Sequence, residues 1–118
     1  MPSWAGAEAA GVEDRILSGW GRTAPSGARV LSPDSLSELP PSDRGVIARG
    51  LGRSYGDAAQ CAGGLVVETS RLDAIEEIDP GTGEVEVGAG VSLEALLEAA
   101  LPQGWFIPVS PGTRQVSG

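Results

Sequence analysis

The residues of this chain with the clearest capacity for chemistry lie in one glycine-rich run. Residues 48–57 read Ala-Arg-Gly-Leu-Gly-Arg-Ser-Tyr-Gly-Asp and follow a short apolar pair, Val46 and Ile47. Glycine adopts positive φ and lets the backbone approach a ligand closely. Successive backbone N–H groups in such a turn form a concave anion site. A strand that leads into this loop, with arginines beside it, therefore predicts a site for a phosphate-bearing ligand, and nucleotide cofactors are the leading candidates.

The composition excludes most other chemistry. The 118 residues contain no histidine, which removes the commonest metal ligand and the usual general base. The single cysteine, Cys61, excludes an internal disulfide and a cysteine-based zinc site. A net charge of −8 opposes nucleic acid and anionic lipid. We therefore expect no metal and no nucleic-acid partner, and a phosphate that is held locally by N–H groups and particular arginines.

The sequence carries no targeting signal that we recognise. No run approaches the roughly 20 apolar residues of a transmembrane helix. The first 14 residues lack the basic and apolar regions of a secretory signal. We expect a location in the cytoplasm or peripheral to the inner membrane.

The spacing of apolar residues and turn formers predicts an α+β domain. Val12, Ile16 and Leu17 predict a short helix that ends at Gly19. Pro80-Gly81-Thr82-Gly83 predicts the turn of a hairpin with arms at 74–79 and 84–87. Ser92 predicts the N-cap of a helix that ends near Pro102. The remaining elements are strands at 29–31, 46–48, 64–68 and 105–107, and a short helix at 34–39 that Pro40-Pro41 stops.

The glycine loop by itself has three interpretations. It can serve only to make tight turns. It can belong to a Rossmann dinucleotide site, but Tyr55 stands in place of the third glycine. Residues 57–64 also lack the apolar stripe of the helix that such a site needs. A Walker A loop is excluded because no Gly-Lys-Ser/Thr occurs. The third interpretation depends on several motifs taken together.

In the order of its motifs the chain resembles the N-terminal part of an FAD-binding domain of the vanillyl-alcohol oxidase, or PCMH, type. The resemblance extends from about residue 20 to residue 117, and is greatest to the oxidases that act on the pentose of a polyprenyl phosphate. The motifs that carry it are Gly-Trp-Gly-Arg-Thr at 19–23, the loop at 48–57, Gly-Gly-Leu-Val-Val at 63–67, Gly-Ala-Gly-Val at 88–91 and Pro-Gly-Thr-Arg-Gln-Val at 111–116.

The resemblance implies a small mixed sheet with flanking helices. Residues 1–18 would form an N-terminal extension, and residues 19–118 the N-terminal subdomain of the FAD-binding domain, which we expect to stop at 118 in the middle of the fold. The pyrophosphate would lie against the glycine loop, and the 112–117 run would add contacts near the flavin. The implied cofactor-binding residues are Ala48, Arg49, Gly50, Leu51, Gly52, Arg53, Ser54, Tyr55, Gly56, Asp57, Ala58, Gly112 and Ser117.

The implied activity is FAD-dependent oxidation of a sugar hydroxyl. The substrate would be a sugar or a polyprenyl-phosphate sugar used in building cell-wall arabinan, and an NAD-dependent reductase is a possible partner. In the family a catalytic lysine lies beyond this segment, so we expect these 118 residues alone to be inactive. The alternatives are an aldonolactone or alditol oxidase of the same superfamily, and a catalytically inert truncated fragment.

We expect the FAD to be held without a covalent bond to this segment. Many relatives attach the flavin to a histidine in a Gly-Gly-His-Ser pattern, and the matching position here is Arg53. Arginine stays protonated in proteins and cannot act as the nucleophile. The flavin should therefore stay in the supernatant when the full-length protein is precipitated with acid. Yellow colour in the pellet that peptide mapping traces to residues 48–61 would contradict this expectation.

Overall fold

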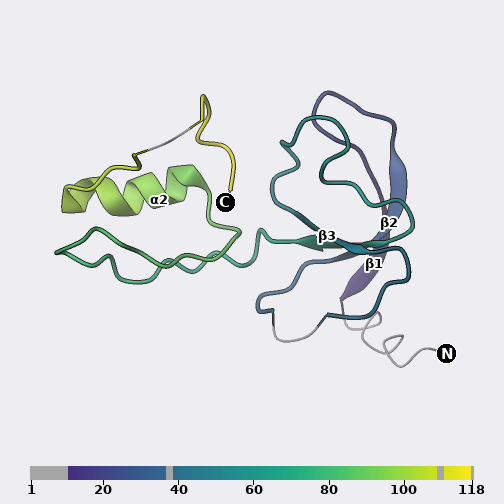
Figure 1. Ribbon diagram of the computed structural model, residues 1–118, viewed down its shortest axis with the longest axis horizontal. Helices are drawn as coiled ribbons and strands as arrows, with labels where there is room; N and C mark the ends of the chain where they lie inside the picture. The colour runs from purple at the N-terminus through teal and green to yellow at the C-terminus, as the bar shows by residue number, and fades with distance from the viewer. Residues whose placement is uncertain (1–10, 37–38, 109–110, 118) are drawn as a thin grey trace.

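A four-stranded mixed sheet and a hairpin with a helix form two lobes that lie side by side (Figure 1). The computed structural model describes residues 11–36, 39–108 and 111–117. The chain extends over 52 × 32 × 16 Å. Its radius of gyration, 16.4 Å, exceeds the roughly 13.5 Å of a compact chain of this length. The two lobes therefore share only a limited contact region, and the site described below lies there.

The sheet has the strand order β1-β2-β4-β3. Strand β1 (Val12–Leu17) lies at one edge of the sheet and pairs antiparallel with β2 (Ser26–Leu31), the next strand in the sequence. Strand β4 (Leu65–Glu68) is central and pairs in parallel with both β2 and β3 (Val46–Arg49). The parallel pairing places the ends of β3 and β4 at one edge of the sheet.

The core of this lobe forms around β4. Leu65 and Val66 are fully buried, and Val67 is 4% exposed. A continuous apolar run of this kind is typical of a strand that is covered on both faces. Val30 of β2 and Leu17 of β1 complete the core.

The second lobe consists of the hairpin, helix α2 (Leu93–Ala100) and the short 3-10 turn η1 (Leu101–Gln103). The hairpin arms pair through the bridge between Ile75 and Val87, and the Asp79 carboxylate accepts a hydrogen bond from the Gly81 N–H at 2.7 Å. The Trp105 ring packs on Gly83, where a Cβ would lie 2.6 Å from the ring. Only glycine fits there, since Gly83 also has a φ of +77°.

The α+β class and the mixed sheet are confirmed, with α2 as the α-helix of the described part of the chain. Strands β3 and β4, the hairpin turn and α2 are confirmed close to their predicted positions. The prediction of a helix over 12–17 is wrong, because these residues form β1. Residues four apart share a face in a strand as well as in a helix, so the apolar spacing did not separate the two.

Two further expectations differ from the structure. Residues 105–107 form no strand. Residues 34–36 and 39 are not helical, and the other two residues of the predicted 34–39 helix, 37 and 38, lie outside the described residues.

The boundary predicted between residues 18 and 19 falls directly after β1, within the sheet lobe, and residues 1–10 of the predicted extension lie outside the described residues. No helix in the described ranges has the length and apolar character that crossing a membrane requires.

A polar cluster joins three strands of the sheet at Glu68. Its carboxylate accepts hydrogen bonds from Arg15 Nη1 of β1 at 2.7 Å and from the Ser32 hydroxyl, just after β2, at 2.6 Å. Partial burial raises the pKa of Glu68, but the hydrogen bonds from Ser32 and Arg15 and the charges of Arg15 and Arg49 outweigh it and hold the pKa below its ordinary value. The ionised carboxylate therefore stabilises the fold.

Glu68→Gln is expected to lower the free energy of unfolding by about 1 kcal/mol at neutral pH. A carboxyl with a lowered folded-state pKa stabilises the protein above its unfolded-state pKa, and this contribution is lost as the pH falls through the folded-state value. The difference in melting temperature between wild type and Glu68→Gln should therefore shrink below about pH 4.5, the ordinary value. The exposed Glu98 on α2 provides the control, Glu98→Gln. A difference for Glu68→Gln that does not change with pH would contradict the role of the charge.

Candidate functional site

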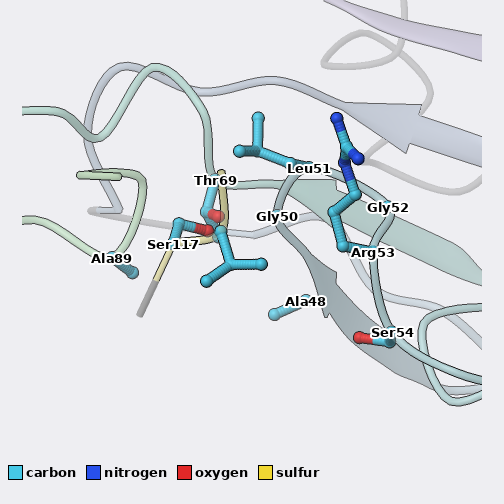
Figure 2. A pocket seen from close by; sticks show the side chains of 10 residues that line it. Ala48, Gly50, Leu51, Gly52, Arg53, Ser54, Thr69, Ala89 and Ser117 are labelled. Carbon is cyan, nitrogen blue, oxygen red and sulfur yellow. The ribbon is translucent and has the colours of Figure 1, made fainter. Parts of the chain in front are cut away.

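The parallel pairing of β3 and β4 brings two chain segments together at the edge of the sheet. The glycine loop follows β3, and Thr69 follows β4 directly. The Thr69 N–H donates to the Arg49 carbonyl at 2.9 Å, which continues the pairing one residue past the strand. Figure 2 shows the Thr69 side chain close to Gly50. The loop that was predicted to bind a phosphate thus begins at the carboxyl ends of parallel strands, where ligands commonly bind in open sheets.

The two lobes and the C-terminal run enclose a cavity of about 310 Å³ at this edge, which we call the loop cavity. It opens beside the glycine loop, and the sheet lobe, the hairpin lobe and the C-terminal run each contribute to its wall (Figure 2). Its lining residues are Ala48, Gly50, Leu51, Gly52, Arg53, Ser54, Thr69, Ala89, Val116 and Ser117.

Glycines allow these segments to approach one another. A Cβ on Gly50 would collide with the Ser117 hydroxyl, and the Thr69 hydroxyl is 3.9 Å from the same position. On the other side, a Cβ on Gly90 would overlap the carbonyl oxygen of Thr69. The Gly90 N–H donates to the Leu72 carbonyl at 2.9 Å. The hairpin lobe is therefore held against the end of β4 by backbone contacts that only glycine permits.

The C-terminal run is fixed on the first turn of α2. The Leu93 N–H donates to the Val116 carbonyl at 2.9 Å, and the Glu94 N–H donates to the Arg114 carbonyl at 3.1 Å. The Ser92 hydroxyl caps the helix by accepting from the Ala95 N–H at 3.1 Å. These contacts use the N–H groups that usually make a helix N-terminus an anion site. An anion in the loop cavity must therefore be held by other donors.

The glycine loop supplies such donors. The backbone N–H groups of residues 50–54 donate no hydrogen bond to any described residue. Gly52 has a φ of +72°, which turns the chain within this run. Ser54 and Ser117, which carry hydroxyl groups, also line the cavity. Free N–H groups around a cavity, with hydroxyls beside them, have the donor chemistry that a pyrophosphate requires.

The structure separates the predicted site residues into three groups. The first group lines the loop cavity: Ala48, Gly50, Leu51, Gly52, Arg53, Ser54 and Ser117. The second group, Tyr55 and Gly112, lines a neighbouring cavity together with Arg53. The third group, Arg49, Gly56, Asp57 and Ala58, lines neither of these two cavities.

Arg49 has a structural contact instead of a place in the cavity wall. Its guanidinium donates to the Ser18 carbonyl at 2.8 Å and to the Ala59 carbonyl at 3.1 Å. It therefore joins the end of β1 to the segment after the glycine loop. Gly52 lies directly over this guanidinium, and a Cβ there would be 2.9 Å from Nη2.

Sequence reasoning missed three residues of the cavity wall: Thr69, Ala89 and Val116. A signal for Thr69 was present, because neighbouring parallel strands end at the same edge and Thr69 is the first residue after β4. Ala89 stands between two glycines, a pattern that indicates close backbone contact. Val116 lies within the 112–117 run that the resemblance placed near the flavin, although it was not among the named cofactor-binding residues.

Comparison with known proteins identifies the protein family to which this chain belongs. The chain belongs to the family of FAD-binding domains, since the model of the FAD binding domain matches residues 36–118. The chain is also 54% identical over 109 residues to decaprenylphosphoryl-beta-D-ribose oxidase of Mycolicibacterium smegmatis. That alignment covers 86% of this chain and 24% of the relative, so the chain spans about a quarter of the relative's length. The predicted family and the predicted cofactor, FAD, are confirmed.

Gly52→Val in the full-length protein is expected to remove most of the bound FAD. A β-branched residue at a φ near +72° carries about 1–3 kcal/mol of strain, and its side chain would displace the Arg49 guanidinium. A change of 1.4 kcal/mol corresponds to tenfold in affinity. Titration of the apoprotein with FAD should therefore show a dissociation constant about tenfold or more above that of wild type.

Gly104→Val provides a matched control for this variant. Gly104 also has a positive φ, +84°, but nothing lies within 4 Å of its added Cβ, and it ends η1 in the hairpin lobe. It carries the same backbone strain without contact with the loop cavity. Equal losses of FAD in the two variants would mean that strain alone, and not the loop, accounts for the effect.

Proposed function

We propose that the protein to which this chain belongs is an FAD-dependent oxidase that acts on a hydroxyl of a polyprenyl-phosphate pentose. The observation that carries the proposal is the 54% identity to the oxidase from Mycolicibacterium smegmatis over 86% of this chain. Bound FAD supplies the oxidant, which takes two electrons from an alcohol. The residues of this chain bind and orient it.

The donors of the loop cavity support a division of roles within the site. The free N–H groups of residues 50–54 would hold the pyrophosphate, with the Ser54 hydroxyl beside them. Thr69 and Ser117 would close the opposite side of the cavity near Gly50 (Figure 2). Arg49 would keep the loop in shape through the Ser18 and Ala59 carbonyls.

The remaining predicted residues complete the proposal. Tyr55 and Gly112 would contact the cofactor from the neighbouring cavity. Gly56, Asp57 and Ala58 would act by shaping the end of the loop, where the Asp57 carbonyl accepts from the Gln60 N–H at 2.9 Å. The FAD would be bound without a covalent link to this segment.

The proposed substrate implies the partner and the place of action. Oxidation of a ring hydroxyl gives a ketone, and an NAD-dependent reductase is a partner that would consume it. A polyprenyl-linked sugar is met at a membrane surface, which favours a protein in the cytoplasm or peripheral to the inner membrane. The alternatives from the same superfamily, aldonolactone and alditol oxidases, act on small water-soluble sugars.

A substrate panel separates these activities. The full-length protein should reduce its FAD when mixed with a polyprenyl-phosphate ribose under anaerobic conditions, and the bleaching of the flavin absorbance measures this. We expect bleaching by the lipid-linked sugar at least about tenfold faster than by an alditol or an aldonolactone, because binding energy from remote parts of a substrate accelerates its reaction. Faster bleaching by a small sugar would favour the alternative. A flavin-loaded protein that none of these substrates bleaches would contradict both.

A further inference from the structure

Arg53 differs from the other arginine of the glycine loop in what its guanidinium contacts. The Arg49 guanidinium is satisfied by two carbonyl groups. The Arg53 guanidinium carbon lies 4.4 Å from the centre of the Trp20 ring, and Arg53 forms no hydrogen bond or ion pair with any described residue. A cation over an indole ring is held by the ring's negative face. The N–H donors at the edge of the guanidinium plane stay available for a ligand.

The backbone around Trp20 is fixed to the glycine loop. The Trp20 N–H donates to the Ser54 carbonyl at 3.3 Å, and Trp20 pairs with Tyr55 as an isolated parallel bridge. A Cβ on the preceding residue, Gly19, would overlap the carbonyl oxygen of Gly56. The Gly19 N–H also donates to the Thr23 hydroxyl at 2.6 Å. The indole is therefore presented to Arg53 by a segment that follows β1 and lies far from the loop in sequence.

Arg53 lies in the wall between the loop cavity and its neighbour. The neighbouring cavity has a volume of about 510 Å³, and no carboxylate of a described residue lines either cavity. Its lining residues are Trp20, Arg53, Tyr55, Pro111, Gly112, Thr113 and Val116. Arg53 is thus a cation with free planar donors between two cavities whose described lining holds no carboxylate. In a chain of net charge −8, such a group selects an anion with several oxygen acceptors.

We infer that Trp20 is a positioning residue that holds the Arg53 guanidinium as a phosphate-binding group in this wall. The inference depends on the proposed function, because the two sources of phosphate at this place are the pyrophosphate of FAD and the phosphodiester of the lipid-linked substrate. A guanidinium binds either through paired N–H···O contacts. Trp20 does not touch the phosphate and acts through the orientation of Arg53.

The test uses the full-length holoenzyme with Arg53→Gln, Trp20→Leu, the double variant and Arg71→Gln. Arg71 pairs with the exposed Asp34 and lines neither cavity, so Arg71→Gln controls for the loss of one positive charge. The dissociation constant of FAD is measured by titration of the apoprotein at several salt concentrations. The KM and kcat are measured with a polyprenyl-phosphate ribose.

Arg53→Gln is expected to weaken phosphate binding about tenfold, as the loss of a charged hydrogen-bond donor does. A higher dissociation constant for FAD with a smaller salt dependence would identify the flavin pyrophosphate as the ligand. A higher KM with kcat within about twofold and unchanged FAD binding would identify the phosphodiester of the substrate. If neither constant differs from that of Arg71→Gln, the inference is overturned.

The double variant tests the role of Trp20. Trp20→Leu should raise the same constant as Arg53→Gln, about threefold or more, and should have no further effect in the Arg53→Gln background. Trp20→Phe, which keeps an aromatic face, should restore most of the binding, and this outcome separates orientation of the arginine from a general loss of folding. Equal effects of Trp20→Leu in both backgrounds would overturn the positioning role. A wild-type protein that takes up no FAD would instead overturn the proposed function.

Discussion

The parallel pairing of β4 with a strand on each side is the constraint on which the rest of this structure depends. Its first two residues, Leu65 and Val66, are fully buried, so β4 can occupy only the centre of the sheet. At its start, a Cβ on Gly64 would lie 2.9 Å from the Gly45 carbonyl oxygen. At its end, Glu68 connects β4 to β1 and to the segment after β2. With both ends fixed, the exits of β3 and β4 meet at one edge.

That edge is open to a ligand because groups outside the glycine loop hold the surrounding segments in place. Gln60 Nε2 donates to the Leu17 carbonyl at 3.0 Å and to the Ala24 carbonyl at 3.1 Å. Its Oε1 accepts from the Thr23 hydroxyl at 2.6 Å. Together with Arg49, this side chain holds the segments around the glycine loop from outside the cavity. The loop keeps its shape without using its own N–H groups at 50–54, which are left for a ligand.

How far the sequence predicted this arrangement depends on how local each signal is. The glycine loop, the turn at 80–83 and the N-cap at Ser92 are encoded by adjacent residues, and the structure contains all three. The apolar spacing at 12–17 predicts a helix, but it fits a strand as well. The strand forms because it pairs with β2, which begins nine residues after β1 ends, and such pairing is a tertiary property that local spacing does not reveal. Residues 105–107 are apolar, as in a strand, but they form none, and the Trp105 ring packs on Gly83 of the hairpin turn.

The same distinction applies to the site. The sequence placed both arginines of the loop against the cofactor, yet only Arg53 lines the cavity. Which arginine faces inward is decided by distant partners, the Ser18 carbonyl for Arg49 and the Trp20 ring for Arg53. Both partners come from the short segment after β1, which no local pattern connects to the glycine loop.

The distribution of charge explains how an acidic chain can belong to a family that binds a dianionic cofactor. Several arginines are paired with carboxylates: Arg15 with Glu68, Arg71 with Asp34 and Arg114 with Glu94. These ion pairs belong to the fold, and each arginine charge in them is neutralised by its partner carboxylate. In the proposed site, the attraction for a pyrophosphate would come from backbone dipoles and a positioned guanidinium, which act over a few ångströms and are little affected by the net charge of −8. Because the first turn of α2 donates to the Arg114 and Val116 carbonyls, the helix supports the cavity wall, and the proposed site leaves the anion to the glycine loop.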